Sequence, residues 1–209
     1  MSNEDASTER REVRAGAFVC VVGPSGAGKD TLIAEARRQL SWRTDVIFPR
    51  RIVTREASSF EDHDSLSREA FLQAEAAGAF AMSWQAHGLH YAIPGAVAAR
   101  IDRGACAVCN LSRAAVAPAR KRFGRVAVVL VTAPKTVIAE RLAARARETS
   151  EAISARLSRE AEFALPIEAD LRIVNVGPVA RCAGELVAHI EALLRGNGAP
   201  PGRPGMGAH

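Results

Sequence analysis

A glycine-rich segment lies between an apolar run and a helical pattern, and it limits the possible folds of this chain more than any other feature. It follows the apolar run Ala17–Val22 directly and leads into residues 29–40, where apolar side chains recur at helical spacing. A strand, a tight loop and a helix in this order bring backbone N–H groups, a helix amino end and a lysine around one point. We therefore predict a phosphate-binding loop rather than a ligand-free turn, formed by Gly23, Pro24, Ser25, Gly26, Ala27, Gly28, Lys29, Asp30 and Thr31.

Short β-branched runs alternate with helical stretches along the rest of the chain, which is typical of a parallel sheet covered by helices on both faces. The fold class is thus predicted to be α/β, a P-loop NTPase fold. The expected strands are 17–22, 46–53, 105–111, 126–131 and 170–176. The expected helices are 29–40, one capped by Ser67, 135–147 after Pro134, 150–163 and 179–194.

Length and composition favour a single domain. The 209 residues are 48% apolar and 24% charged, which predicts one kinase-sized domain over 15–195 with disordered ends at 1–14 and 196–209. The apolar runs are too short to span a bilayer, the amino terminus lacks a secretory pattern, and four scattered cysteines form no disulfide framework. We expect a soluble cytoplasmic protein with no membrane partner.

The net charge of +5 is mild support for an anionic ligand. The chain has no long basic run and few aromatic residues between its basic ones, so a nucleic-acid partner is not expected. Small phosphorylated molecules are the expected partners, and the sequence leaves the oligomeric state open. Cys106 and Cys109, three apart on one predicted strand, face opposite sides and are interpreted as core thiols rather than metal ligands.

One position departs from the usual phosphate-loop pattern, in which Ser or Thr follows the lysine and binds magnesium. Here Asp30 follows Lys29, and Thr31 comes next. A carboxylate is a hard oxygen ligand that suits Mg²⁺, and a helix amino end favours its charge. We expect Asp30 to bind Mg²⁺ directly or through water, and the sequence does not decide between Asp30 and Thr31 as the ligand.

Arginines gather in two further regions. Arg141 and Arg145 share one helix face and Arg156 lies on the next helix, so residues 141–160 are interpreted as a lid whose cations stabilise a transferring phosphoryl group. A solvated basic face paired with nearby glutamates is the alternative. Residues 50–95 are interpreted as an acceptor-binding region, and the candidate substrate-binding residues there and beyond are Arg51, Arg55, Ser83, Tyr91, Asn110 and Arg113.

These pieces resemble the guanylate kinase group of P-loop phosphotransferases over most of the chain. The resemblance rests on Gly23–Thr31, Val53-Thr-Arg55, Gly88 with Tyr91, Glu140–Arg147 and Ile173-Val-Asn175. Met82 stands where that group has the base-reading glutamate, and Val108 and Asn110 replace an acidic pair. A pocket without its base-reading carboxylate loses the hydrogen bonds that select guanine, so GMP is not the expected acceptor.

Within the group, the chain looks like the ribose 1,5-bisphosphate phosphokinase family, which is associated with bacterial phosphonate degradation. The motifs that carry this likeness are the loop ending in Lys-Asp, Arg51-Ile-Val-Thr-Arg55, Phe80-Ala-Met-Ser-Trp84, His87-Gly-Leu-x-Tyr91 and Asn110-Leu-Ser-Arg113. The resemblance implies transfer of the γ-phosphoryl group of ATP, with Mg²⁺, to the 1-phosphate of ribose 1,5-bisphosphate, giving 5-phosphoribosyl 1-diphosphate.

The same resemblance implies roles for individual residues. Lys29, Arg141, Arg145 and Arg156 would stabilise the transferring group, and Arg55 with Tyr91 would hold an acceptor phosphate. Asn110 and Arg113 would contact the sugar or its second phosphate. Two alternatives stay open: a nucleoside monophosphate kinase with relaxed base choice, and a catalytically inactive guanylate-kinase-like binding module.

Overall fold

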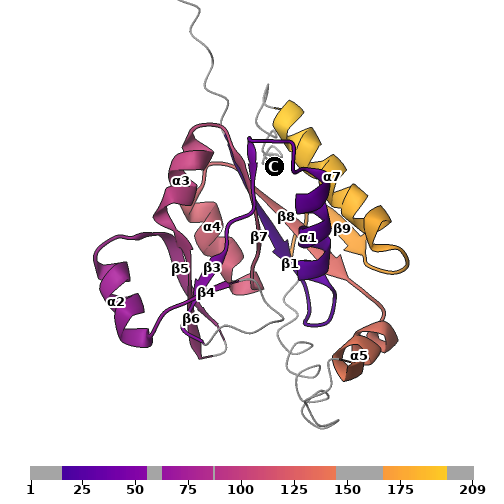
Figure 1. Ribbon diagram of the computed structural model, residues 1–209, viewed down its shortest axis with the longest axis horizontal. Helices are drawn as coiled ribbons and strands as arrows, with labels where there is room; N and C mark the ends of the chain where they lie inside the picture. Colours follow the sequence, from indigo (N-terminus) through magenta and orange to yellow (C-terminus); the bar gives the residue numbers. More distant parts are fainter. Residues whose placement is uncertain (1–15, 56–62, 87, 145–166, 197–209) are drawn as a thin grey trace, which may run out of the picture.

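The computed structural model describes residues 16–55, 63–86, 88–144 and 167–196 (Figure 1). Its centre is a five-stranded sheet with the order β2-β7-β1-β8-β9, and every neighbouring pair is parallel. The strands are β1 (Ala17–Val22), β2 (Val46–Ile47), β7 (Cys106–Asn110), β8 (Val126–Thr132) and β9 (Leu171–Val174). The predicted α/β class is confirmed, and β1 occupies the centre of the sheet because it is apolar on both faces.

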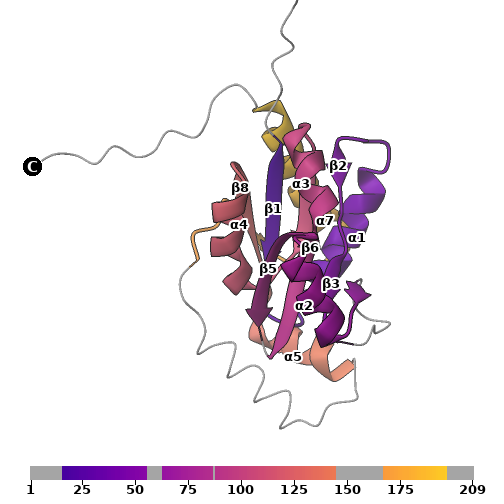
Figure 2. The same ribbon diagram turned by 90° about the vertical axis from the view of Figure 1, so that its left-hand side faces the viewer.

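Helices and a second sheet cover the two faces of the central sheet. Alternate residues of β1 pack against α1 (Lys29–Gln39) and α7 (Val179–Arg195) on one face. The other face packs against α3 (Gly95–Asp102), α4 (Val116–Arg122) and the second sheet. Figures 1 and 2 show these layers from two directions. Cys106 belongs to the first core and Cys109 to the second, which confirms the predicted opposite orientation of these buried thiols.

The second sheet has four strands in the order β4-β3-β6-β5, and the sequence pattern does not predict it. Its strands are β3 (Arg51–Val53), β4 (His63–Ser65), β5 (Phe80–Ala86) and β6 (Leu89–Pro94). The prediction of one strand over 46–53 is wrong, because the chain leaves the central sheet after Ile47 and enters the second sheet at Arg51. Pro49, which lacks the N–H that a continuing ladder needs, lies in the break.

Most of the other predicted elements are confirmed. Ser67 caps α2 (Arg68–Ala76) by accepting a hydrogen bond from Ala70 N at 3.1 Å. Helix α5 (Lys135–Ala144) begins after Pro134 as expected. The remainder of the predicted helix to residue 147 and the predicted helix over 150–163 lie outside the described residues. Among the described residues, none of the helices is both long and apolar enough to cross a membrane.

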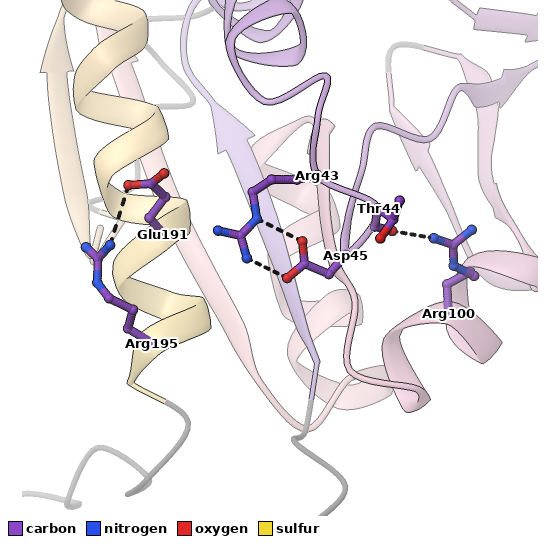
Figure 3. A network of polar contacts seen from close by, with 6 residues as sticks. All are labelled: Arg43, Thr44, Asp45, Arg100, Glu191 and Arg195. Carbon is purple, nitrogen blue, oxygen red and sulfur yellow. Dashed lines mark hydrogen bonds and ion pairs between the residues drawn. The ribbon is translucent and has the colours of Figure 1, made fainter.

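The edge of the sheet where β2 and β7 begin is held by polar contacts of the segment between α1 and β2 (Figure 3). Arg43 binds Asp45 through two hydrogen bonds, Nε to Oδ1 at 2.8 Å and Nη2 to Oδ2 at 2.5 Å. Arg100 Nη2 donates to Thr44 O at 2.8 Å and so ties α3 to the same segment. These contacts lie at the opposite edge from the glycine-rich loop, which follows the carboxyl end of β1.

Candidate active site

The glycine-rich loop joins the carboxyl end of β1 to the amino end of α1, in the middle of the sheet edge. Gly28 is the N-cap of α1 with a φ of +87°, a left-handed conformation that favours glycine. A Cβ at Gly28 would lie 2.3 Å from Asn175 Nδ2, and one at Gly23 would lie 2.0 Å from Val131 O. Gly23 and Gly28 therefore leave no room for a Cβ, because β8 approaches Gly23 and the segment after β9 approaches Gly28. The left-handed backbone at Gly28 is a second reason for glycine at that position.

Lys29 folds across the loop from the first turn of α1. Its Nζ donates to Gly23 O at 2.8 Å and to Pro24 O at 2.9 Å. Ala27 N donates to Pro24 O at 3.2 Å and closes a turn within the loop. The ammonium group and the amino end of α1 thus lie on one compact segment, the arrangement that concentrates positive potential for a phosphate.

Asn175 and Arg141 fasten the loop from the other side. Asn175 Nδ2 donates to Ala27 O at 2.7 Å, and Asn175 is buried, with an exposure of 3%. Arg141 Nη1 donates to Ala27 O at 3.4 Å, and its Nη2 donates to Asn175 O at 3.0 Å. From the sequence, Asn175 is named only as part of the motif Ile173-Val-Asn175, and no role is predicted for it. It lies near the carboxyl end of the predicted strand 170–176, and this place is the signal that could have identified it.

Asp30 and Asn110 meet at the end of β7. Asn110 Nδ2 donates to Asp30 Oδ1 at 2.6 Å, so the amide fixes one carboxylate oxygen. The Thr31 side chain is exposed, whereas Asp30 is half-buried beside β7. Among the described residues there is no group of three or more His, Cys, Asp or Glu side chains that could hold a metal. Mg²⁺ at phosphate sites is held by one or two carboxylates together with phosphate oxygens, so an oriented Asp30 fits that chemistry.

A pocket adjoins this pair between α1 and β7, and we call it the α1–β7 pocket. Its wall on the α1 side follows the helix from the first turn to the third, and Arg51 of β3 closes it with an exposure of only 9%. Asn110 and Arg51, both predicted as substrate-binding, are thus brought together with Asp30. The lining residues are Asp30, Ile33, Ala34, Arg37, Pro49, Arg51, Val108, Cys109 and Asn110.

The second sheet carries Tyr91 on β6, and Arg55 comes just after the end of the neighbouring strand β3. Tyr91 of β6 lies opposite Val53 of β3, and Arg55 follows two residues later as an exposed side chain. The Tyr91 ring stacks on Trp84, with centroids 5.3 Å apart and planes at 12°. Arg51 and Val53 alternate with Ile52, so they share the face of β3 on which Tyr91 lies.

The remaining predicted site residues have different positions. Ser83 is next to Trp84 on β5 and faces the other side of that sheet, where its Oγ donates to Glu75 of α2, so the structure does not bring it to Tyr91. Arg113 is half-buried in a 3₁₀ turn over Arg113–Ala115, just after β7. Arg145 and Arg156 lie outside the described residues, so of the lid arginines the structure places Arg141 alone.

Comparisons with known proteins agree with this fold. Residues 18–165 match the family model described as an AAA domain. A ribose 1,5-bisphosphate phosphokinase PhnN from Methylobacterium radiotolerans is 49% identical over 85% of this chain and 98% of its own. One from Acidiphilium cryptum is also 49% identical, over 78% of this chain and 85% of its own. A guanylate kinase from Anaplasma phagocytophilum has the same fold, with a TM-score of 0.60, 17% identity and 86% of each chain covered.

Proposed function

This chain belongs to the ribose 1,5-bisphosphate phosphokinase family, and we propose on that basis that it transfers the γ-phosphoryl group of ATP to the 1-phosphate of ribose 1,5-bisphosphate. The products are 5-phosphoribosyl 1-diphosphate and ADP. The observation that supports this most directly is the built phosphate loop, in which Lys29 reaches back over Gly23 and Pro24 at the centre of the sheet edge.

In the proposed step an oxygen of the 1-phosphate attacks the γ-phosphorus, and the bond from that phosphorus to the β,γ-bridging oxygen breaks, leaving ADP. A phosphate monoester is largely ionised at neutral pH, so the step needs no general base. Catalysis then consists of alignment and of cations that offset the charge of two polyanions. Lys29 and Arg141 are proposed to supply such cations, together with Arg145 and Arg156.

Magnesium is proposed to bind with the nucleotide at Asp30. When bound, the ion would offset the negative charge of the phosphate groups. The hydrogen bond from Asn110 holds the Asp30 carboxylate in place, and the exposed Thr31 hydroxyl in the same helical turn stays the other candidate ligand.

We propose a separate role for each region of the chain. Residues 15–195 would form the kinase domain, with 1–14 and 196–209 as flanking tails. Residues 50–95, which include the second sheet, would form the acceptor-binding part, where Arg55 and Tyr91 hold the acceptor phosphate that is phosphorylated. Residues 141–160 would act as the lid. The neighbouring positions of β3 and β6 support the acceptor assignment.

Product identification tests the proposal. The purified protein is incubated with ATP, Mg²⁺ and ribose 1,5-bisphosphate and followed by phosphorus NMR, where a new diphosphate on carbon 1 of the sugar is expected. Parallel incubations replace the sugar by GMP or another nucleoside monophosphate. Release of ADP with those acceptors, and none with the sugar, would favour a nucleoside monophosphate kinase.

The third possibility, an inactive binding module, is separated by calorimetry. An active kinase is expected to bind ATP with a dependence on Mg²⁺, whereas a module whose phosphate loop has decayed would bind no ATP. The intact contacts of Lys29 within the loop favour the active enzyme.

A further inference from the structure

Two buried side chains of the second sheet have nitrogens that bind none of the described residues. His63 of β4 is 1% exposed, and neither of its ring nitrogens has a hydrogen-bond partner in the described part of the chain. The same holds there for Nε1 of Trp84 on β5, and Trp84 is 7% exposed. An imidazole always has at least one N–H, and burying such a donor unpaired costs free energy. These nitrogens therefore indicate a polar ligand on the second sheet.

Strand pairing places both side chains on one face of this sheet. His63 is paired with Arg51 of β3. Two residues further along β3, Val53 is paired with Tyr91 of β6, and Tyr91 is paired with Trp84. Paired residues point to the same side of a sheet, as do residues two apart on one strand. His63 therefore shares a face with Arg51 and Tyr91, two of the candidate substrate-binding residues.

This face adjoins the α1–β7 pocket at Arg51. Arg51 lines that pocket and is separated from His63 by one strand spacing, about 4.8 Å. Ser65, two residues after His63 and on the same side of β4, is exposed, so the face meets solvent next to the buried ring. A ligand that contacts Arg51 would thus lie one strand spacing from the imidazole.

The surroundings of His63 favour an anionic ligand. Arg51 places a guanidinium group at the adjacent position, and Arg50 Nη2 donates to His63 O at 2.7 Å. Asp64, the next residue of β4, faces the other side of the sheet and pairs with Arg50 at 3.2 Å. The described residues include no group of three His, Cys, Asp or Glu side chains, so they offer His63 no partners for a metal site. An N–H beside a guanidinium group suits a phosphate oxygen.

We infer that His63 is an acceptor-binding residue, whose imidazole donates a hydrogen bond to a phosphate oxygen of the acceptor beside Arg51. The inference rests on the proposed function, because it takes a phosphorylated acceptor to bind at the second sheet. The Trp84 nitrogen supports a polar ligand on this face and is assigned no contact of its own. The sequence does not single out His63, since its place beside Arg51 depends on the pairing of β3 with β4.

Calorimetry with ribose 1,5-bisphosphate in the presence of ADP and Mg²⁺ tests the inference. His63→Leu removes both nitrogens at a similar side-chain volume, and it is expected to weaken bisphosphate binding by about 10- to 100-fold, the usual effect of losing a hydrogen bond to a charged group. ADP affinity is expected to stay within about 3-fold. The free energy of unfolding without ligand should not fall, because the nitrogens bind none of the described residues. His63→Asn or His63→Gln, which keep an N–H, should restore part of the affinity.

His90→Leu is the matched control. His90 precedes Tyr91 on β6 and therefore lies on the other face of the same sheet, where its ring is 5.4 Å from that of Phe71 between centroids. This variant is expected to keep bisphosphate affinity within about 3-fold. Equal losses in His63→Leu and His90→Leu, or an unchanged affinity in His63→Leu, would overturn the inference.

Two further measurements locate the contact. With ribose 5-phosphate and ribose 1-phosphate as separate probes, His63→Leu should weaken one and leave the other within about 3-fold, which identifies the phosphate that is bound. Equal losses for both probes would contradict a single contact. Should His63→Leu fail to fold, NMR of the ring nitrogens in the wild-type protein decides the question. Bisphosphate should shift the His63 signals, and signals that do not move would refute the contact.

Failure of the proposed function gives a different pattern. If the wild-type protein phosphorylates GMP but not the bisphosphate, and His63→Leu raises the KM for GMP, the function is contradicted and the role of His63 stands. Turnover of the bisphosphate with an unchanged KM in His63→Leu supports the function and contradicts the role of His63.

Discussion

Replacing Gly28 by alanine should destabilise the protein far more than the same change at a glycine with similar backbone conformation. Gly28 has a φ of +87°, and a Cβ there would lie 2.3 Å from Asn175 Nδ2. That amide is almost fully buried and donates to Ala27 O at 2.7 Å, so moving it away from the added Cβ would break a buried hydrogen bond. Gly78 has a φ of +70° with nothing within 4 Å of its added Cβ, which makes Gly78→Ala a matched control.

The magnitude follows from two contributions. A left-handed backbone costs an L-residue about 1–2 kcal/mol, and this applies to both variants. Loss of the buried hydrogen bond from Asn175 to Ala27 costs about 1–3 kcal/mol more and applies only to Gly28→Ala. The expected decrease in the free energy of unfolding is therefore about 2–5 kcal/mol for Gly28→Ala and about 1–2 kcal/mol for Gly78→Ala. A chain of this size loses about 2–4 °C in Tm per kcal/mol.

A double-mutant cycle measured by urea unfolding checks the cause as well as the size. In an Asn175→Ala background the nearest remaining atom to the added methyl group is Arg141 Nη1 at 3.5 Å, an ordinary van der Waals contact. Gly28→Ala should then cost only its backbone strain, so the two changes should couple by about 1–3 kcal/mol. The reasoning fails if Gly28→Ala costs no more than Gly78→Ala, or if its cost is the same with and without the Asn175 side chain.

Three further predictions concern the loop, its neighbour on β7 and the core. Lys29→Met should reduce kcat by at least about 100-fold in a coupled assay of ADP release, because it removes the cation proposed to stabilise the transferring group. Asn110→Asp should lower the free energy of unfolding at pH 7 by about 1–3 kcal/mol, because a carboxylate would replace the amide that donates to Asp30 at 2.6 Å; urea unfolding of both proteins measures the difference. Burial raises the pKa of Cys20 and Cys106 from 9.0 to about 12. As the pH rises, these thiols lose their protons in the unfolded chain before they do so in the folded protein. The free energy of unfolding should therefore be independent of these groups below pH 9 and fall between pH 9 and 12. In urea titrations, Cys106→Ala should make that decline less steep.

The elements that the sequence predicts well are those whose signal is local and strong. The apolar run of β1 forms a strand with the predicted limits, and α7 (Val179–Arg195) differs from its predicted range by one residue. The second sheet carries no such signal. Strands β3 and β4 have three residues each, β4 reads His-Asp-Ser, and their pairing depends on partners far along the chain. Short strands with polar residues are stabilised by pairing and packing, which periodicity does not report.

The site also has one part that the sequence predicts and one part that it does not. The phosphate loop is contiguous in sequence, so its residue types and their order are enough to identify it. The contacts that shape it join residues 80 positions apart, Asp30 and Asn110, and 148 positions apart, Asn175 and Ala27. These pairs depend on the strand order that places β7 beside β1 and β9 beside β8, and a single sequence does not supply that order.

Strand order also relates two departures from the guanylate kinase pattern to each other, namely Asp30 after the loop lysine and Asn110 in place of an acidic residue. A carboxylate after the loop lysine brings negative charge toward a bound polyphosphate, and a second carboxylate at the end of β7 would lie within hydrogen-bond distance of it. Two like charges at that separation repel, whereas an amide donates to the carboxylate and aligns it. Asp30 therefore requires a neutral donor at position 110.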